Sequence, residues 1–220
     1  MNYRSVFDII GPVMVGPSSS HTAGAAKIGR VARKLLGTVP IKAAVILYGS
    51  FAETYQGHGT DVAIAAGLLD FDERNPNLPD SLSIAEKQGM QITFTADKQT
   101  PVDHPNTVRI SLTDGSEMME IVGVSIGGGK IEINEVNGFS VSLSGSNPAL
   151  LVLHHDRYGA VAEVAGMIAT YEMNISYMQV SRKQKGSLAL MVIQTDEEIG
   201  DDLVTGVSHL PNILNVAVLT

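Results

Sequence analysis

Hydrophobic residues recur with a helical period at several places along this chain. Between residues 28 and 36 the apolar side chains follow the spacing i, i+3, i+4, i+7 and i+8, which puts them on one face of a helix ending at Gly37. Ser83 and Glu86 have the spacing of a capping box, which indicates the start of another helix. Helices are therefore expected over residues 5–10 and 28–36, from residue 61 onward, and over residues 83–89.

Other stretches alternate apolar and polar residues, or are short and apolar throughout, and these predict strands. In "FSVSLS" (139–144) three apolar residues alternate with three serines, which is typical of a strand with one face in water. Strands are expected over residues 43–49, 91–96, 108–113, 119–127 and 139–144. The mixture predicts an α+β domain whose sheet is partly antiparallel.

The last third of the chain has its own regular pattern. Small polar residues and a proline in "SGSNPAL" (144–150) suggest a boundary between domains at residues 1–146 and 148–220. After it we expect strand 149–155, helix 159–172, strands 175–181 and 187–195, helix 199–210 and strand 213–219. This βαββαβ order is that of a ferredoxin-like unit.

Composition excludes several functions. The chain has 220 residues, of which 44% are hydrophobic, and a net charge of -8, so it can build cores but offers no basic face for nucleic acid. It contains no cysteine, which rules out disulfides and thiolate metal ligands within it. The N-terminal residues do not form a signal peptide and no apolar run would span a membrane, so a soluble, cytoplasmic protein is expected.

The stretch "GPSSSHTAG" (16–24) places four hydroxyls and an imidazole in five consecutive positions. One hydroxyl, from Ser20 or Thr22, would be enough to cap the helix that follows. Capping does not explain why Ser18, Ser19 and His21 are there as well. Because a helix start exposes backbone N–H groups, we interpret the stretch as a carboxylate-binding or catalytic loop.

Two more histidines lie in expected loops of the first domain. In "GHGTD" glycines flank His58, which leaves the imidazole accessible, and a histidine is the natural proton carrier near neutral pH. An ordinary loop histidine beside a helix start is an equally good interpretation of this segment. His104 precedes Pro105, which holds it extended. "SIGGGK" (125–130) lacks the spacing of a nucleotide-binding loop and is better explained as a tight turn.

Four motifs, "GPSSSHT", "YGSFAETYQGHGTD", "HPNT" and "SIGGG", occur in the order seen in the β chains of bacterial two-chain, iron–sulfur-dependent L-serine dehydratases, and the chain resembles that family over essentially its whole length. The resemblance implies conversion of L-serine to pyruvate and ammonia with a 4Fe-4S cluster. The cluster would be ligated by cysteines of a partner α chain, with one iron acting as Lewis acid on the serine hydroxyl. It also implies a first domain similar to the intervening domain of some phosphoglycerate dehydrogenases.

The resemblance also implies roles for particular residues. His21, His58 and His104 would be the candidates for proton transfer, and the motifs do not decide which is the base. The substrate would be bound by hydroxyl and carboxylate groups from two of the motifs, namely Ser18, Ser19, Ser20, Thr22, Thr60 and Asp61.

The tail resembles an ACT domain, a small regulatory module. The resemblance makes Asp156, Gly159 and Asn174 candidates for contact with an amino-acid effector, although Tyr158 stands where many ACT domains have proline. Such a domain would regulate the enzyme or mediate homodimerisation.

A different class of function stays open from the residues alone. A free-standing regulatory protein that binds an amino acid without catalysis would also lack cysteine and a complete catalytic set. A binding protein needs donors for a carboxylate but no cluster of imidazoles. Substitution of Ser19 or His21 should then change affinity only.

Overall fold

The computed structural model describes residues 16–219, which divide into two compact units after Asn137. This division lies in the Asn137–Gly138 turn, where both residues have positive φ, as a two-residue hairpin turn requires. The domain boundary at residues 146–148 stays a prediction. The helix expected over residues 5–10 lies outside the described residues.

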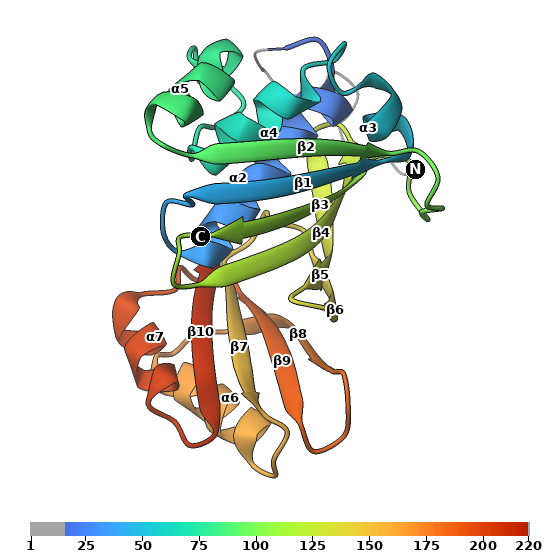
Figure 1. Cartoon of the computed structure of the whole chain (residues 1–220). Coiled ribbons are helices and arrows are strands. Elements are labelled where there is room, and N and C mark those ends of the chain that lie inside the picture. Colours follow the sequence, from blue (N-terminus) through green and yellow to red (C-terminus); the bar gives the residue numbers. More distant parts are fainter. Residues whose placement is uncertain (1–15, 220) are drawn as a thin grey trace. The chain divides into compact units, whose positions relative to one another are not determined.

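A six-stranded sheet has the order β2-β1-β3-β4-β5-β6 (Figure 1). The partly antiparallel sheet is confirmed, because β1 pairs parallel with β2 and antiparallel with β3, while β3 and β4 and also β4 and β5 pair antiparallel. The strands are β1 (Lys42–Tyr48), β2 (Gln91–Asp97), β3 (Thr107–Thr113), β4 (Met118–Gly127), β5 (Lys130–Val136) and β6 (Phe139–Leu143). "SIGGG" ends β4 and supplies the tight turn to β5 with its last two glycines, and all three glycines have positive φ.

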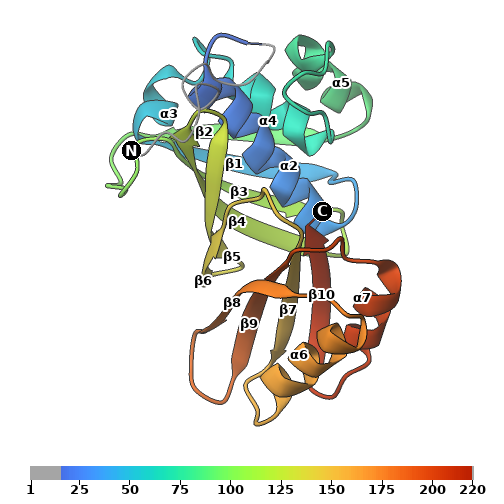
Figure 2. The ribbon, with the colours of Figure 1, turned by 180° about the vertical axis from the view of Figure 1, so that it is seen from behind.

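Helices of the first unit cover one face of this sheet (Figure 2). They are η1 (Ser19–Gly24), α2 (Ala25–Leu36), α3 (Gly49–Thr54), α4 (Thr60–Leu68), η2 (Leu78–Asp80) and α5 (Ser81–Lys87). The apolar stripe predicted on α2 is buried, and its end at Gly37 is confirmed by a left-handed C-cap. The predicted capping box is wrong, because α5 begins at Ser81 and Ser83 therefore lies inside the helix. The helix α3 was not expected. No helix within residues 16–219 is long and apolar enough to cross a bilayer.

Two glycines let α2 and α4 approach closely. A Cβ atom added to Gly29 would lie 2.6 Å from the carbonyl oxygen of Ile64. One added to Gly67 would overlap the carbonyl oxygen of Ala26 and lie 2.5 Å from the backbone nitrogen of Arg30. The obstacles are backbone atoms, which cannot rotate away, so only glycine fits at these crossing points.

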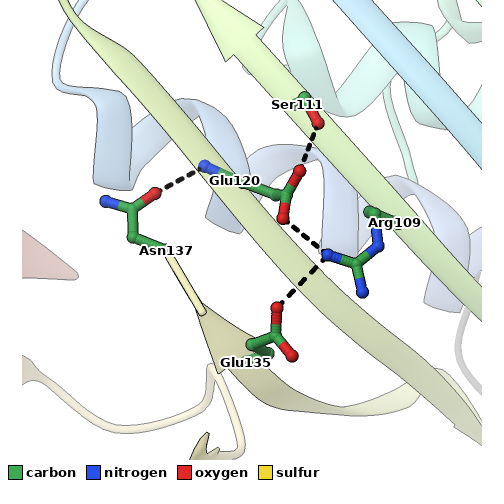
Figure 3. A network of polar contacts seen from close by, with 5 residues as sticks. All are labelled: Arg109, Ser111, Glu120, Glu135 and Asn137. Carbon is green, nitrogen blue, oxygen red and sulfur yellow. Dashed lines mark hydrogen bonds and ion pairs between the residues drawn. The ribbon is translucent and has the colours of Figure 1, made fainter. Parts of the chain in front are cut away.

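The other face of the sheet carries a polar network across β3, β4 and β5 (Figure 3). Arg109 Nη1 donates to carboxylate oxygens of Glu120 at 2.5 Å and Glu135 at 3.2 Å. Ser111 donates to the second carboxylate oxygen of Glu120 at 2.8 Å, and Asn137 Oδ1 accepts from the Glu120 backbone N–H. One guanidinium thus joins carboxylates from two neighbouring strands.

We expect the substitution Glu120→Gln to lower the free energy of unfolding by about 0.5–1 kcal/mol, because the ion pair is half-exposed and screened by water. About 1 M salt should reduce this loss, since it screens the pair in the wild type. Urea unfolding at low and high salt measures both effects. The control is Glu86→Gln on the exposed side of α5, and a loss of equal size there would contradict a role for the network.

After β6, the second unit confirms the predicted βαββαβ order. Its sheet has the order β10-β7-β9-β8, as in ferredoxin-like units, with β7 antiparallel to both β9 and β10. Its core consists of apolar residues from the sheet and from both helices. The elements are β7 (Ala149–His155), α6 (Ala160–Thr170), β8 (Ile175–Arg182), β9 (Leu188–Thr195), α7 (Asp201–Ser208) and β10 (Ile213–Leu219).

Candidate active site

The serine-rich stretch forms the first turns of a helix rather than a loop before it. Residues Ser19–Gly24 make a π-helical turn that continues into α2, and such widened turns are frequent at functional sites. Ser18 caps this turn, since its Oγ accepts a hydrogen bond from the His21 backbone N–H at 3.2 Å. The expectation that Ser20 or Thr22 would supply the cap was therefore wrong, and their hydroxyls are left for other contacts.

A chain of hydrogen-bonded side chains runs through the imidazole of His21. Ser18 Oγ lies 3.3 Å from Ser20 Oγ, which lies 3.1 Å from His21 Nδ1. On the other side of the ring, His21 Nε2 lies 3.1 Å from the Oγ of Ser50, in the first turn of α3. A neutral imidazole has one N–H and one lone pair, so one of the two hydroxyl groups donates to the ring while the other accepts.

The ring of His21 is packed against two other rings. Its ring makes T-shaped contacts with Phe51, with centroids 5.2 Å apart, and with His58, with centroids 4.7 Å apart. Burial lowers the pKa of His21 below its ordinary value, and the charge that His58 carries when protonated lowers this pKa further. A neutral imidazole has one nitrogen lone pair that can accept a proton.

His58 is held beside His21 by its backbone. Thr22 Oγ1 donates to the His58 carbonyl oxygen at 3.2 Å, so Thr22 positions this histidine within the cluster. The His58 Nδ1 atom is buried and has no hydrogen-bond partner, and the same holds for Thr60 Oγ1 two residues later. Buried polar atoms are nearly always paired, so these two atoms make His58 and Thr60 candidates for contact with a bound group.

His104 lies in a turn that is joined to the His21 cluster through the backbone. Its Nδ1 accepts from the Asn106 N–H at 3.1 Å, which fixes the ring within the turn. The next carbonyl, of Pro105, accepts from the Ser50 N–H at 2.7 Å. The His104 turn is thereby attached to the residue whose hydroxyl contacts His21.

The remaining candidates of this unit lie on the same two helix starts. Ser19 is half-buried in the first turn of η1, and Thr60 and Asp61 are the first two residues of α4. Asp61 Oδ1 accepts from the Val62 N–H at 2.9 Å. The structure thus brings η1 and α4, and with them the motifs around His21 and His58, into one cluster.

Two residues of this cluster escaped sequence reasoning. Ser50 contacts His21 although 29 residues separate them, and a lone serine at the start of a short helix carries no chemical signal. Ser125 is fully buried with an unpaired Oγ, and a Cβ atom on Gly24 would overlap this hydroxyl. The Ser125 side chain therefore packs against Gly24 in η1, where any residue larger than glycine would collide with it.

The lowered pKa of His21 has a consequence for stability. As the pH falls below about 6.5, the ordinary imidazole pKa, His21 is protonated in the unfolded chain before the folded one. The free energy of unfolding should therefore decrease from this pH downward until His21 is protonated in the folded chain too. Urea unfolding measured from pH 8 to 5 should show a smaller decrease in the free energy of unfolding for His21→Asn than for the wild type. Equal decreases in the two proteins would contradict the lowered pKa of His21.

The second unit does not bring its three candidates together within one chain. Asp156 and Gly159 follow the end of β7, whereas Asn174 precedes β8, which starts at the opposite end of the sheet. A seven-residue strand, about 20 Å, separates these two ends. Asp156 accepts hydrogen bonds from the Gly186 N–H at 2.8 Å and from Arg182 at 3.1 Å. Both bonds lower the pKa of Asp156, and the bond from Gly186 has the larger effect. Asn174 Nδ2 donates to Asp196 at 2.7 Å.

The described residues offer no site for a metal ion, and the sequence offers no thiolate for an iron–sulfur cluster. The sequence has no cysteine, and iron–sulfur clusters are normally held by thiolates. Between residues 16 and 219 no three side chains of histidine, aspartate and glutamate gather closely enough to hold a metal ion.

Comparison with known proteins defines the class. The model of the family "Serine dehydratase beta chain" matches residues 5–86, and that of the "AHAS small subunit-like ACT domain" matches residues 150–215. The chain is 55% identical to the probable L-serine dehydratase β chain of Bacillus subtilis, covering 98% of each chain. It is 32% identical to the L-serine dehydratase β chain of Peptoniphilus asaccharolyticus, covering 94% of each. A D-3-phosphoglycerate dehydrogenase of Methanocaldococcus jannaschii is 27% identical over 65% of this chain and 27% of its own length.

These matches define a lyase subunit with a serine dehydratase β domain followed by an ACT domain. The chain belongs to the family of L-serine dehydratase β chains. The resemblance drawn from the four motifs is confirmed, and so is the predicted fold class.

Proposed function

We propose that this chain is the β subunit of an L-serine dehydratase, which converts L-serine to pyruvate and ammonia, and that it completes an active site shared with an α chain. The observation that carries the proposal is the polar cluster around His21. A neutral imidazole there touches two hydroxyl groups and a second imidazole. The proposal also rests on the family of the chain.

The residues of the cluster suit separate parts of the reaction. Ser18, Ser19 and Ser20 offer hydroxyl donors for the carboxylate or amino group of L-serine. Loss of the proton on Cα and of the hydroxyl gives an aminoacrylate, whose imine tautomer hydrolyses to pyruvate and ammonia. We assign the proton transfer to His21 and His58, because their rings are in contact and His21 is kept neutral.

The remaining candidates take supporting places in this proposal. His104 is a third candidate for proton transfer, through a turn attached to Ser50. Thr22 positions His58, while Thr60 and Asp61 border the same site from α4.

The cofactor belongs to the partner in this proposal. A 4Fe-4S cluster would be held by the α chain, since this chain has no thiolate to offer. We infer that the β chain is inactive alone and that the enzyme works in the cytoplasm. Its ACT domain would mediate homodimerisation or bind an amino acid. An effector that touched both Gly159 and Asn174 would need these residues from two different copies, because they lie at opposite ends of one sheet.

Reconstitution tests the proposal. The chain is purified anaerobically with the α-type partner encoded beside it, and pyruvate formation from L-serine is measured for each chain alone and for both together. Pyruvate only with both chains present supports a shared active site. Equal activity of the α chain alone would overturn it and favour a regulatory protein without catalysis, which titration of L-serine onto this chain would then test.

A further inference from the structure

Ser50 occupies a position between two parts of the candidate site. Its Oγ lies 3.1 Å from His21 Nε2, and its backbone N–H donates to the Pro105 carbonyl oxygen at 2.7 Å. The first contact reaches the serine-rich turn of η1 and the second reaches the turn that holds His104. Phe51 also joins these two segments, through its ring against His21 and a longer contact of 3.4 Å from its N–H to the Pro105 carbonyl oxygen, but only Ser50 does so with a side-chain hydrogen bond to the imidazole.

The hydroxyl of Ser50 does not serve its own helix. Tyr48 is the N-cap residue of α3, and no side chain caps this helix start. A serine at a helix start usually turns its hydroxyl to a nearby backbone N–H. Here the hydroxyl is directed to an imidazole 29 residues earlier in the chain.

The backbone around Ser50 leaves little freedom for this contact to shift. Gly49 has a φ of +53°, and a Cβ atom there would lie 2.6 Å from the Pro105 carbonyl oxygen. Only glycine allows the two backbones to come this close, and the close approach fixes where Ser50 begins α3. Thr54 Oγ1 donates to the Ser50 carbonyl oxygen at 2.8 Å and holds the residue from the other side.

The contact decides how the His21 ring can lie. Ser20 Oγ alone would leave the ring free to rotate about one hydrogen bond at Nδ1. A second partner at Nε2 fixes the ring plane. It also couples the tautomer to the two hydroxyl groups, because the protonated ring nitrogen must face an accepting hydroxyl and the other nitrogen a donating one. Phe51 and His58 contact the ring only through its faces and edges.

We propose that Ser50 is a positioning residue, which holds the His21 ring in one orientation and one tautomer and joins it to the His104 turn. The inference rests on the proposed role of His21 in proton transfer. Ser50 acts through His21 in this account and does not itself touch the substrate.

The test combines kinetics of the reconstituted enzyme with a spectroscopic measurement on this chain alone. We expect Ser50→Ala to lower kcat for L-serine by about 10- to 100-fold, because the proton acceptor is misplaced, while KM changes little. Ser50→Thr keeps the hydroxyl and should restore most of kcat. The control Ser83→Ala removes an exposed hydroxyl of α5 and should leave both constants unchanged.

Nitrogen NMR of the full-length chain labelled at histidine shows the tautomer directly. The ring nitrogens of His21, assigned by their loss in His21→Asn, should change their chemical shifts in Ser50→Ala but not in Ser83→Ala. This measurement does not depend on serine turnover, so it tests Ser50 even if no pyruvate forms and the proposed function fails. Unchanged ring shifts in Ser50→Ala would overturn the inference, as would a Ser50→Thr enzyme as slow as Ser50→Ala.

Discussion

Replacing His21 with alanine is expected to lower the kcat of the enzyme reconstituted from this chain and its α partner by about 10²- to 10⁴-fold. The substitution removes a neutral imidazole whose two nitrogens contact Ser20 and Ser50 and whose ring contacts His58. The measurement is the steady-state rate of pyruvate formation from L-serine, with KM determined in parallel. A loss confined to kcat would show that His21 acts in the transition state rather than in substrate binding.

Matched variants keep this result interpretable. His209→Ala removes an exposed histidine at the end of α7 and should leave kcat unchanged. His21→Asn keeps a polar side chain, so equal losses in the asparagine and alanine variants with unchanged unfolding midpoints would exclude misfolding as the cause. An alanine variant with wild-type kcat would mean that His58 or His104 carries the proton without His21. A change in KM alone would favour the non-catalytic, amino-acid-binding alternative.

The largest loss of stability is expected from Gly67→Ala, which should lower the free energy of unfolding by about 3 kcal/mol or more. The added methyl group would overlap the Ala26 carbonyl oxygen and lie 2.5 Å from the Arg30 backbone nitrogen. Helix α2 would have to move away from α4, and α2 directly continues the turn that carries His21. Urea unfolding followed by circular dichroism measures the loss. Hydrogen exchange in α2 shows whether it arises there.

Gly166→Ala is the control for the effect of alanine on helix formation itself. Gly166 lies inside α6, is exposed, and has no atom within 4 Å of the added Cβ position. Alanine there should raise the free energy of unfolding by about 0.5–1 kcal/mol, because it loses less backbone entropy than glycine on folding. If both variants changed stability in the same direction, the close approach of α2 and α4 would not be what requires glycine at position 67.

The sequence predicted most of the local structure, because burial repeats with the period of each element. The apolar stripe of α2 and the alternation in β6 were readable from five or six residues each. The errors occurred at the starts of helices. Ser18, rather than Ser20 or Thr22, caps the helix start, and α5 begins before Ser83. Several residues of the serine-rich stretch could each supply a cap, and the sequence does not rank them.

By itself, the sequence determined the fold class, the regular tail and the motifs that identify the family, since each depends on neighbouring residues. It also brought together His21 and the serines beside it. Only the tertiary structure decided that Ser50 meets His21 and that Thr22 holds His58. It likewise decided that Asn174 lies away from Gly159. These relations depend on how strands align and how closely helices approach each other. The residues concerned are 15 to 36 positions apart in the chain, so no pattern of neighbouring residues reveals the distance between them.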